Sequence, residues 1–118
     1  MTTKETTKIY HNPRCSKSRQ TLQLLTERGE EPEVIEYLKT PPDVTEVTEL
    51  LEKLKMSPLE LVRKGEDVYK DTDFANQSTD DQIKLMVTHP ILIERPIVVR
   101  GSRALIGRPP ESVLTLLD

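Results

Sequence analysis

A single cysteine, Cys15, is the candidate nucleophile of this chain. It stands at the end of the segment His11-Asn12-Pro13-Arg14-Cys15, and its neighbours on both sides are polar. Asn followed by Pro is typical of a helix start, so we expect Asn12 to cap a helix and Pro13 to be its first residue. Cys15 would then lie in the first turn, where unpaired backbone N–H groups and the helix dipole stabilise an anion. The segment therefore predicts a reactive thiolate rather than an inert, buried cysteine.

The count of one cysteine and two histidines limits the chemistry further. It excludes a disulfide within the chain, and it offers no cysteine and histidine spacing that predicts a metal site. Ser18 occupies the position of the second cysteine in the Cys-x-x-Cys pattern of dithiol oxidoreductases. A redox cycle at Cys15 must therefore take its second thiol from another molecule.

Four residues near the cysteine are candidates to support it, namely His11, Asn12, Ser18 and Arg19. Arg19 follows Cys15 by four residues, so it would project from the same face of the helix. His11 could hold the thiolate in an ion pair or bond only to the backbone, and the sequence leaves both alternatives open. Asn12 could bind an anion, although helix capping alone would account for it.

Arginines elsewhere in the chain could complete an anion site. Arg63 ends a short expected helix, and Arg95 and Arg108 each precede a proline. Guanidinium groups offer planar, paired donors that suit tetrahedral oxyanions. Spacing alone nevertheless favours a solvated surface position for each of the three.

The elements that must position these residues alternate in type along the chain. Apolar spacing and turn residues predict a strand at 8–11, a helix ending near Arg28 before Gly29, and a strand at 34–38. They then predict a helix at 44–54, a short helix opened by Ser57-Pro58, a loop-rich stretch at 64–78 and a helix from Thr79 to just before Pro90. A hairpin at 97–106 with its turn at Gly101-Ser102, and a helix opened by Pro109-Pro110, end the series.

This order, β-α-β, then helices, then β-β-α, predicts an α/β protein with a thioredoxin-like fold. At 118 residues the chain fits one domain over 1–118, with a helical insertion at roughly 43–90. The net charge of −3 comes from mixed acidic and basic residues, which argues against nucleic-acid binding. No window reaches the ~20 apolar residues of a membrane span, and the N-terminus lacks a secretory signal, so we expect a cytoplasmic protein.

Six segments, in order along nearly the whole chain, match the pattern of a known family. They are Ile9-Tyr10-His11-Asn12-Pro13 with Cys15 and Ser18-Arg19, Leu61-Val62-Arg63-Lys64, Thr79-Asp80-Asp81-Gln82, His89-Pro90-Ile91-Leu92-Ile93, Arg95-Pro96-Ile97-Val98-Val99 and Gly107-Arg108-Pro109. With these segments the chain resembles the glutaredoxin-coupled arsenate reductases, the ArsC family, and in particular its short YfgD-type members. The loop reads Arg14-Cys15-Ser16, where classic members have a small residue before the cysteine and glycine after it.

The resemblance implies a thioredoxin-like fold and a reaction in which Cys15 attacks arsenate to form a covalent adduct. Glutathione would enter as co-substrate, arsenite would leave, and glutaredoxin would resolve the mixed disulfide, with no bound cofactor. The resemblance assigns oxyanion binding to Arg63, Arg95 and Arg108, and to His11 a part in keeping the cysteine ionised. Pro96 stands where thioredoxin-like folds place a cis proline, although the sequence does not show the isomer.

Two other functions use the same fold. Relatives named Spx are non-enzymatic regulators that bind RNA polymerase and sense oxidation, commonly through Cys-x-x-Cys. Ser18 weakens that reading, because the second cysteine is missing. A general monothiol transferase, which reduces glutathionylated substrates without any oxyanion, is the third reading. The expected arginine set favours oxyanion chemistry over both.

Overall fold

The computed structural model describes residues 6–117, and its backbone contacts divide the chain into two compact units. One unit joins the residues up to Glu36 to those from Arg95 onward, and the other is Tyr37–Glu94. The second unit is an insertion between the two halves of the first, and it is wider than the 43–90 expected from the sequence. That the whole of 1–118 forms one domain stays a prediction.

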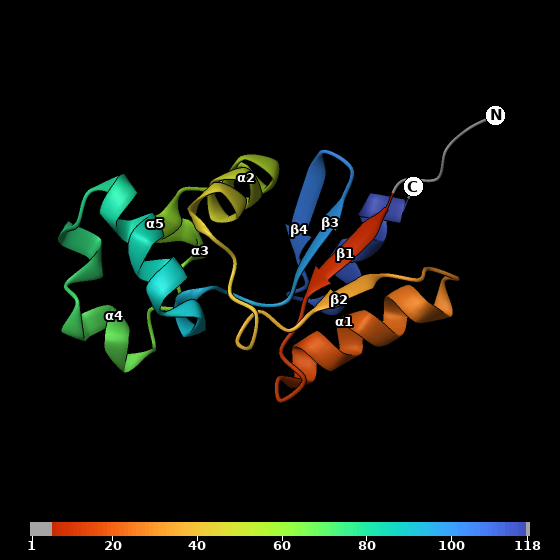
Figure 1. Cartoon of the computed structure of the whole chain (residues 1–118). Helices are drawn as coiled ribbons and strands as arrows, with labels where there is room; N and C mark the ends of the chain where they lie inside the picture. Colours follow the sequence, from red (N-terminus) through yellow and green to blue (C-terminus); the bar gives the residue numbers. More distant parts are fainter. Residues whose placement is uncertain (1–5, 118) are drawn as a thin grey trace. The chain divides into compact units, whose positions relative to one another are not determined.

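The first unit contains a four-stranded sheet with the strand order β2-β1-β3-β4 (Figure 1). β1 pairs with β2 in parallel, while β3 pairs in antiparallel fashion with both β1 and β4. A parallel β-α-β unit joined to an antiparallel hairpin is the thioredoxin-like arrangement predicted above. Its elements are β1 (Thr7–Tyr10), α1 (Ser16–Glu27), β2 (Glu33–Ile35), β3 (Ile97–Arg100), β4 (Arg103–Ile106) and the 3₁₀ helix η3 (Pro110–Leu117).

One row of apolar side chains across the sheet forms the core of this unit. Ile9, Val98 and Leu105 are paired neighbours on β1, β3 and β4, so their side chains share one face of the sheet. They belong to a cluster with buried residues of α1 and η3, including Leu25 and Val113. The two helices also contact each other. Burial of this face holds α1 and η3 against the sheet.

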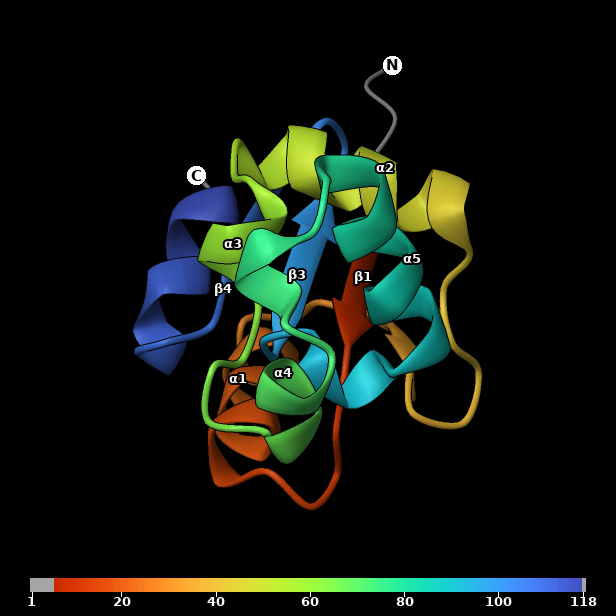
Figure 2. The ribbon, with the colours of Figure 1, turned by 90° about the vertical axis from the view of Figure 1, so that its left-hand side faces the viewer.

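The second unit is helical (Figure 2). α5 packs against both α2 and α3, and buried side chains such as Phe74 and Met86 fill its interior. The Tyr37 hydroxyl donates to the carbonyl of Ile93 at 3.3 Å, which ties the start of the unit to its end. Its elements are α2 (Val44–Leu54), α3 (Pro58–Leu61), α4 (Asp67–Asp71), the 3₁₀ helix η1 (Phe74–Asn76), α5 (Thr79–Thr88) and the 3₁₀ helix η2 (Pro90–Leu92).

Capping residues set the starts of these helices. The Asp43 side chain accepts from the Glu46 N–H at 2.8 Å, and α2 then runs over the predicted 44–54. Ser57 and Glu60 form a reciprocal capping box around Pro58, which confirms the helix start read from Ser57-Pro58. Ser78 caps α5, one residue before the predicted first residue.

One expectation about elements is wrong, and the structure adds detail to two others. β2 ends at Ile35 rather than at residue 38. The stretch 64–78 contains α4 and η1, anchored by the buried ring of Phe74 against Tyr69 at a centroid distance of 5.7 Å. The last helix is of the 3₁₀ type, with Val113 and Leu116, three residues apart, buried on one side.

Within residues 6–117, none of the helices has the length and apolar character that crossing a bilayer requires.

Candidate active site

Cys15 is the N-cap residue of α1. Its backbone is extended, with φ −95° and ψ 123°, and the helix begins at Ser16. The expectation that Asn12 caps the helix and Pro13 opens it is therefore wrong by about one turn. The consequence for chemistry is favourable, because a side chain at the N-cap faces the unpaired N–H groups of the first turn directly.

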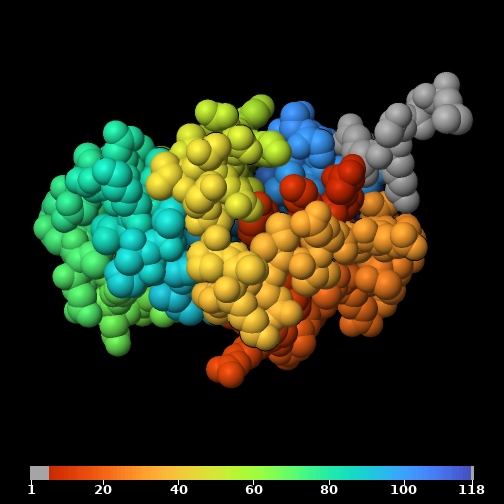
Figure 3. Space-filling view, in the orientation of Figure 1, coloured from red at the N-terminus to blue at the C-terminus, as the bar shows by residue number. Residues whose placement is uncertain are grey.

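The segment before Cys15 folds into a tight turn instead of a first helical turn. The Cys15 N–H donates to the carbonyl of Asn12 at 3.0 Å, and the Asn12 side-chain oxygen accepts from the Arg14 N–H at 3.0 Å. Arg19 donates from Nη1 to the Pro13 carbonyl at 2.9 Å. This hydrogen bond from Arg19 stabilises the turn. The red-orange segment that contains the turn lies at the molecular surface in Figure 3.

Ser18 anchors the same turn from the buried side of α1. Its side chain is fully buried, and its hydroxyl oxygen accepts from the Asn12 N–H at 3.0 Å. The same oxygen lies 2.6 Å from Nδ1 of His11. Burial lowers the pKa of His11, the nearby Glu36 carboxylate raises it and Arg19 lowers it, with a net lowering. Nδ1 of a neutral imidazole can accept a hydrogen bond from the Ser18 hydroxyl, which fits a role in hydrogen bonding better than an ion pair with the thiolate.

The surroundings of the Cys15 sulfur favour its ionised form. Partial burial raises the pKa of the thiol, but hydrogen bonds from the Ser18 N–H, the Arg95 side chain and the Lys17 N–H lower it. The positive charge of Arg95 lowers it further, so the pKa of Cys15 lies below its ordinary value. A larger fraction of this thiol is therefore thiolate at neutral pH than of an ordinary cysteine.

Two of the three predicted arginines lie at the sulfur. Arg108 donates from Nη2 to Cys15 Sγ at 3.6 Å, and its Nε donates to the Arg95 carbonyl at 2.9 Å. Nε and Nη1 of Arg95 are buried from solvent, whereas Arg108 is exposed. The peptide bonds Arg95-Pro96 and Arg108-Pro109 are both cis, and the second of these was not anticipated. The structure thus brings Cys15, Arg95 and Arg108 together.

Arg63 belongs to the helical unit. Its Nη1 lies 3.0 Å from Oε1 of Glu94, and its Nε lies 3.4 Å from Oε2 of Glu66. Its backbone N–H donates to the carbonyl of Leu92 at 2.7 Å, beside the isolated bridge between Val62 and Ile93. Two carboxylates therefore hold this guanidinium group, and a part for Arg63 in oxyanion binding stays a prediction.

One contribution to the site was not identified from the sequence. Gly107 leaves room for α1, since a Cβ atom there would lie 2.5 Å from the Thr21 hydroxyl oxygen and 2.8 Å from a ring carbon of Pro96. A glycine directly before Arg108 was the available signal for such a close approach.

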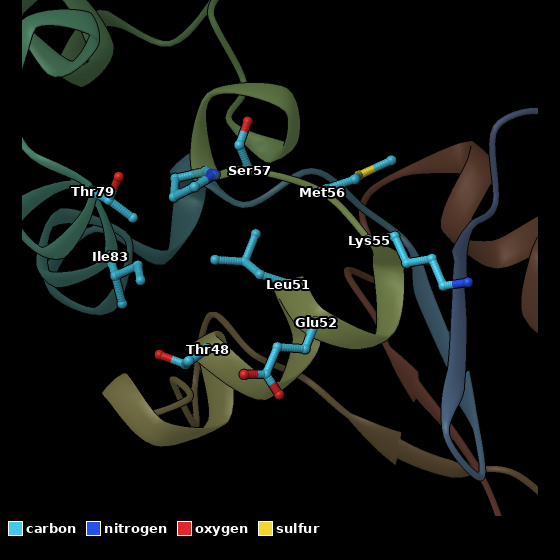
Figure 4. Close-up of a pocket in the computed structure, with 9 residues that line it drawn as sticks. Thr48, Leu51, Glu52, Lys55, Met56, Ser57, Thr79 and Ile83 are labelled. Atoms are coloured by element: carbon cyan, nitrogen blue, oxygen red, sulfur yellow. The ribbon is translucent and has the colours of Figure 1, made fainter.

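The hollow on the helical unit drawn in Figure 4 contains none of the predicted site residues. Leu51 and Ile83 line it from α2 and α5. Among the described residues, no group of three His, Cys, Asp or Glu side chains is placed to hold a metal ion.

Comparison with known proteins gives consistent results over nearly the whole chain. The model of the ArsC family matches residues 10–116. The chain is 54% identical over 113 residues to the uncharacterized protein YfgD of Escherichia coli K12, covering 93% of this chain and 95% of that protein. It is 42% identical to an arsenate reductase of Neisseria meningitidis, covering 93% and 97%. A solved arsenate reductase structure from Vibrio cholerae superimposes with a TM-score of 0.91 at 44% identity, covering 96% and 98%.

Proposed function

This chain belongs to the ArsC family, and from that membership we propose that it is an arsenate reductase with Cys15 as its nucleophile. The observation that carries the proposal is the convergence of Arg95 and Arg108 on the sulfur of an N-cap cysteine. The site combines a thiolate with donors that attract a tetrahedral oxyanion to it. The relatives named arsenate reductase support the same substrate.

In the first step the Cys15 sulfur attacks the arsenic atom of arsenate. A sulfur–arsenic bond forms, one oxygen leaves as water after protonation, and arsenic remains in the +5 state. The backbone N–H groups of Lys17 and Ser18 in the first turn of α1 lower the pKa of Cys15 and so favour the thiolate that attacks. The guanidinium groups of Arg95 and Arg108 neutralise the charge of the incoming oxyanion.

In the second step a glutathione thiol attacks the Cys15 sulfur. The sulfur–arsenic bond breaks with its electron pair going to arsenic, which leaves as arsenite in the +3 state. The two sulfurs are oxidised together to a mixed disulfide between Cys15 and glutathione. A glutaredoxin thiolate then attacks the glutathione sulfur and returns Cys15 to its thiolate form. The serine at position 18 is consistent with this cycle, because no second thiol follows Cys15 on the helix.

A coupled assay tests the proposal. Arsenate is added to the protein with glutathione, glutaredoxin, glutathione reductase and NADPH, and NADPH oxidation is followed. We expect arsenate-dependent oxidation that is lost in Cys15→Ser and reduced at least tenfold in Arg108→Lys, because lysine lacks the paired planar donors. Turnover by the wild type no faster than by Cys15→Ser would contradict the proposal.

Two further measurements distinguish arsenate reduction from the two rival functions. A general monothiol transferase would reduce a glutathione mixed disulfide, and neither arsenate nor phosphate would protect Cys15 from alkylation. A regulator of the Spx kind would retain the α-subunit of RNA polymerase on a column of the protein. The two arginines at the sulfur favour arsenate reduction over both functions, because neither rival requires an oxyanion site.

A further inference from the structure

A small hollow lies on the sheet unit, between α1 and the start of η3. It has a volume of about 260 Å³ and is lined by Gln20, Gln23, Leu24, Glu27, Pro110 and Glu111. Sites for small molecules have volumes of roughly 300–1,000 Å³, so this hollow suits one arm of a small ligand rather than the whole. None of the residues identified above as supporting the thiolate lines it.

The lining of the hollow favours a positively charged ligand group, whereas the arginines at Cys15 favour an anion. It contains two carboxylates and two side-chain amides, and the described residues that form it include no lysine or arginine. The Gln23 amide donates to Oε1 of Glu27 at 3.0 Å, which fixes the orientation of that carboxylate. Such a lining repels an oxyanion and attracts an ammonium group, while the amides offer donors to a carboxylate attached to the same carbon.

Both walls of the hollow belong to segments that also contribute to the site at Cys15. Gln20 and Gln23 follow Cys15 by five and eight residues on α1, which corresponds to about 8 and 12 Å along the helix axis. On the other wall, Pro110 and Glu111 follow Arg108, whose Nη2 contacts the Cys15 sulfur. In glutathione, eight bonds separate the cysteine sulfur from the γ-glutamyl amino group, and this arm extends about 10 Å. A peptide whose thiol meets Cys15 can therefore place one end in the hollow.

We propose that this hollow binds the γ-glutamyl end of glutathione when its thiol reacts at Cys15. The γ-glutamyl end carries an ammonium and a carboxylate group on one carbon, which matches the carboxylates and amides of the lining. The glycine end carries a carboxylate alone and is repelled by Glu27 and Glu111. The inference rests on the proposed function, in which glutathione is the co-substrate. It also separates the two substrates, because arsenate and the γ-glutamyl arm then bind groups of opposite charge.

A reaction without arsenate tests this binding site. The Cys15 thiolate attacks one sulfur of glutathione disulfide, a bond forms between Cys15 and one glutathione, and the other glutathione leaves as its thiolate. The rate is followed by the mass increase of the protein. It is compared with the rate for glutathione disulfide acetylated on its amino groups, which lacks the ammonium charge. We expect the wild type to react about fivefold faster with the unmodified disulfide, as two exposed ion pairs would give.

The variant Glu27→Gln with Glu111→Gln removes both carboxylates without changing their size. We expect it to lose the fivefold preference. The matched control is Glu31→Gln with Glu33→Gln, which removes two exposed carboxylates of the same unit outside the hollow and should keep the preference. A wild type without the preference, a first variant that keeps it, or a control that loses it would each overturn the inference. Failure of arsenate reduction alone would leave this readout intact, so the two proposals can fail separately.

Discussion

Replacement of Ser18 by alanine removes the anchor of the active-site turn. The Ser18 side chain is fully buried, and its oxygen serves both the Asn12 N–H and Nδ1 of His11. Alanine leaves these two buried groups without that partner, and each such loss costs about 1–3 kcal/mol. We expect the free energy of unfolding to fall by about 2–6 kcal/mol. The loosened turn should also raise the pKa of Cys15 toward its ordinary value.

Urea unfolding at pH 7 measures the first effect. With a slope of about 2 kcal/mol per molar urea, the middle of the usual range, the midpoint should fall by about 1–3 M. Ser16→Ala is the matched control, because Ser16 is exposed at the start of the same helix and should change stability by less than about 0.5 kcal/mol. A loss in Ser18→Ala no larger than in Ser16→Ala would refute the reasoning that the buried hydroxyl holds the turn.

Three further predictions concern the sulfur, the backbone and the helical unit. Arg95→Met should raise the pKa of Cys15, measured by the pH dependence of alkylation, because it removes both a hydrogen bond and a positive charge; an unchanged pKa would contradict the assigned cause. Gly107→Ala should cost about 1–3 kcal/mol in thermal or urea unfolding, since its Cβ would overlap the Thr21 side chain, and a neutral result would disprove the close approach. Ser57→Ala should cost about 1 kcal/mol through loss of a cap, with the alkylation profile of Cys15 as the readout that stays constant.

Local patterns in the sequence predicted the parts of the fold that local interactions determine. The hairpin follows from two β-branched or apolar runs around Gly101, whose φ of 61° suits glycine. The helix at 44–54 follows from its apolar spacing, and α3 follows from Ser57-Pro58. Each of these signals lies within about ten residues of sequence.

The sequence prediction was wrong or incomplete where the same signal is compatible with two structures. Asn12-Pro13 is compatible with a helix start and with a turn, and the buried Ser18 hydroxyl on α1 selects the turn by taking the Asn12 N–H. The apolar spacing of Val113 and Leu116 fits both an α-helix and a 3₁₀ helix. In 64–78 one buried ring, Phe74, anchors the short helices, and a single residue has no periodicity to detect.

The candidate site was predictable in its nucleophile but not in its geometry. Cys15 is identified by its position after Asn12-Pro13 and by being the one cysteine of the sequence. Arg95 and Arg108 come from distant parts of the chain, so spacing alone could not bring them to the sulfur, and resemblance to a family was needed. The donors from the first turn depend on the exact residue at which α1 begins, which differs by a few residues from the prediction.

The most direct test of the central claim is alkylation of Cys15 as a function of pH, with and without arsenate. Removal of the proton occurs at a lower pH than in an ordinary cysteine, because the helix N–H groups and Arg95 stabilise the thiolate. The account predicts an apparent pKa below the ordinary value of about 8.5, and protection of the thiol by arsenate at neutral pH. An ordinary pKa together with no protection by arsenate would contradict it.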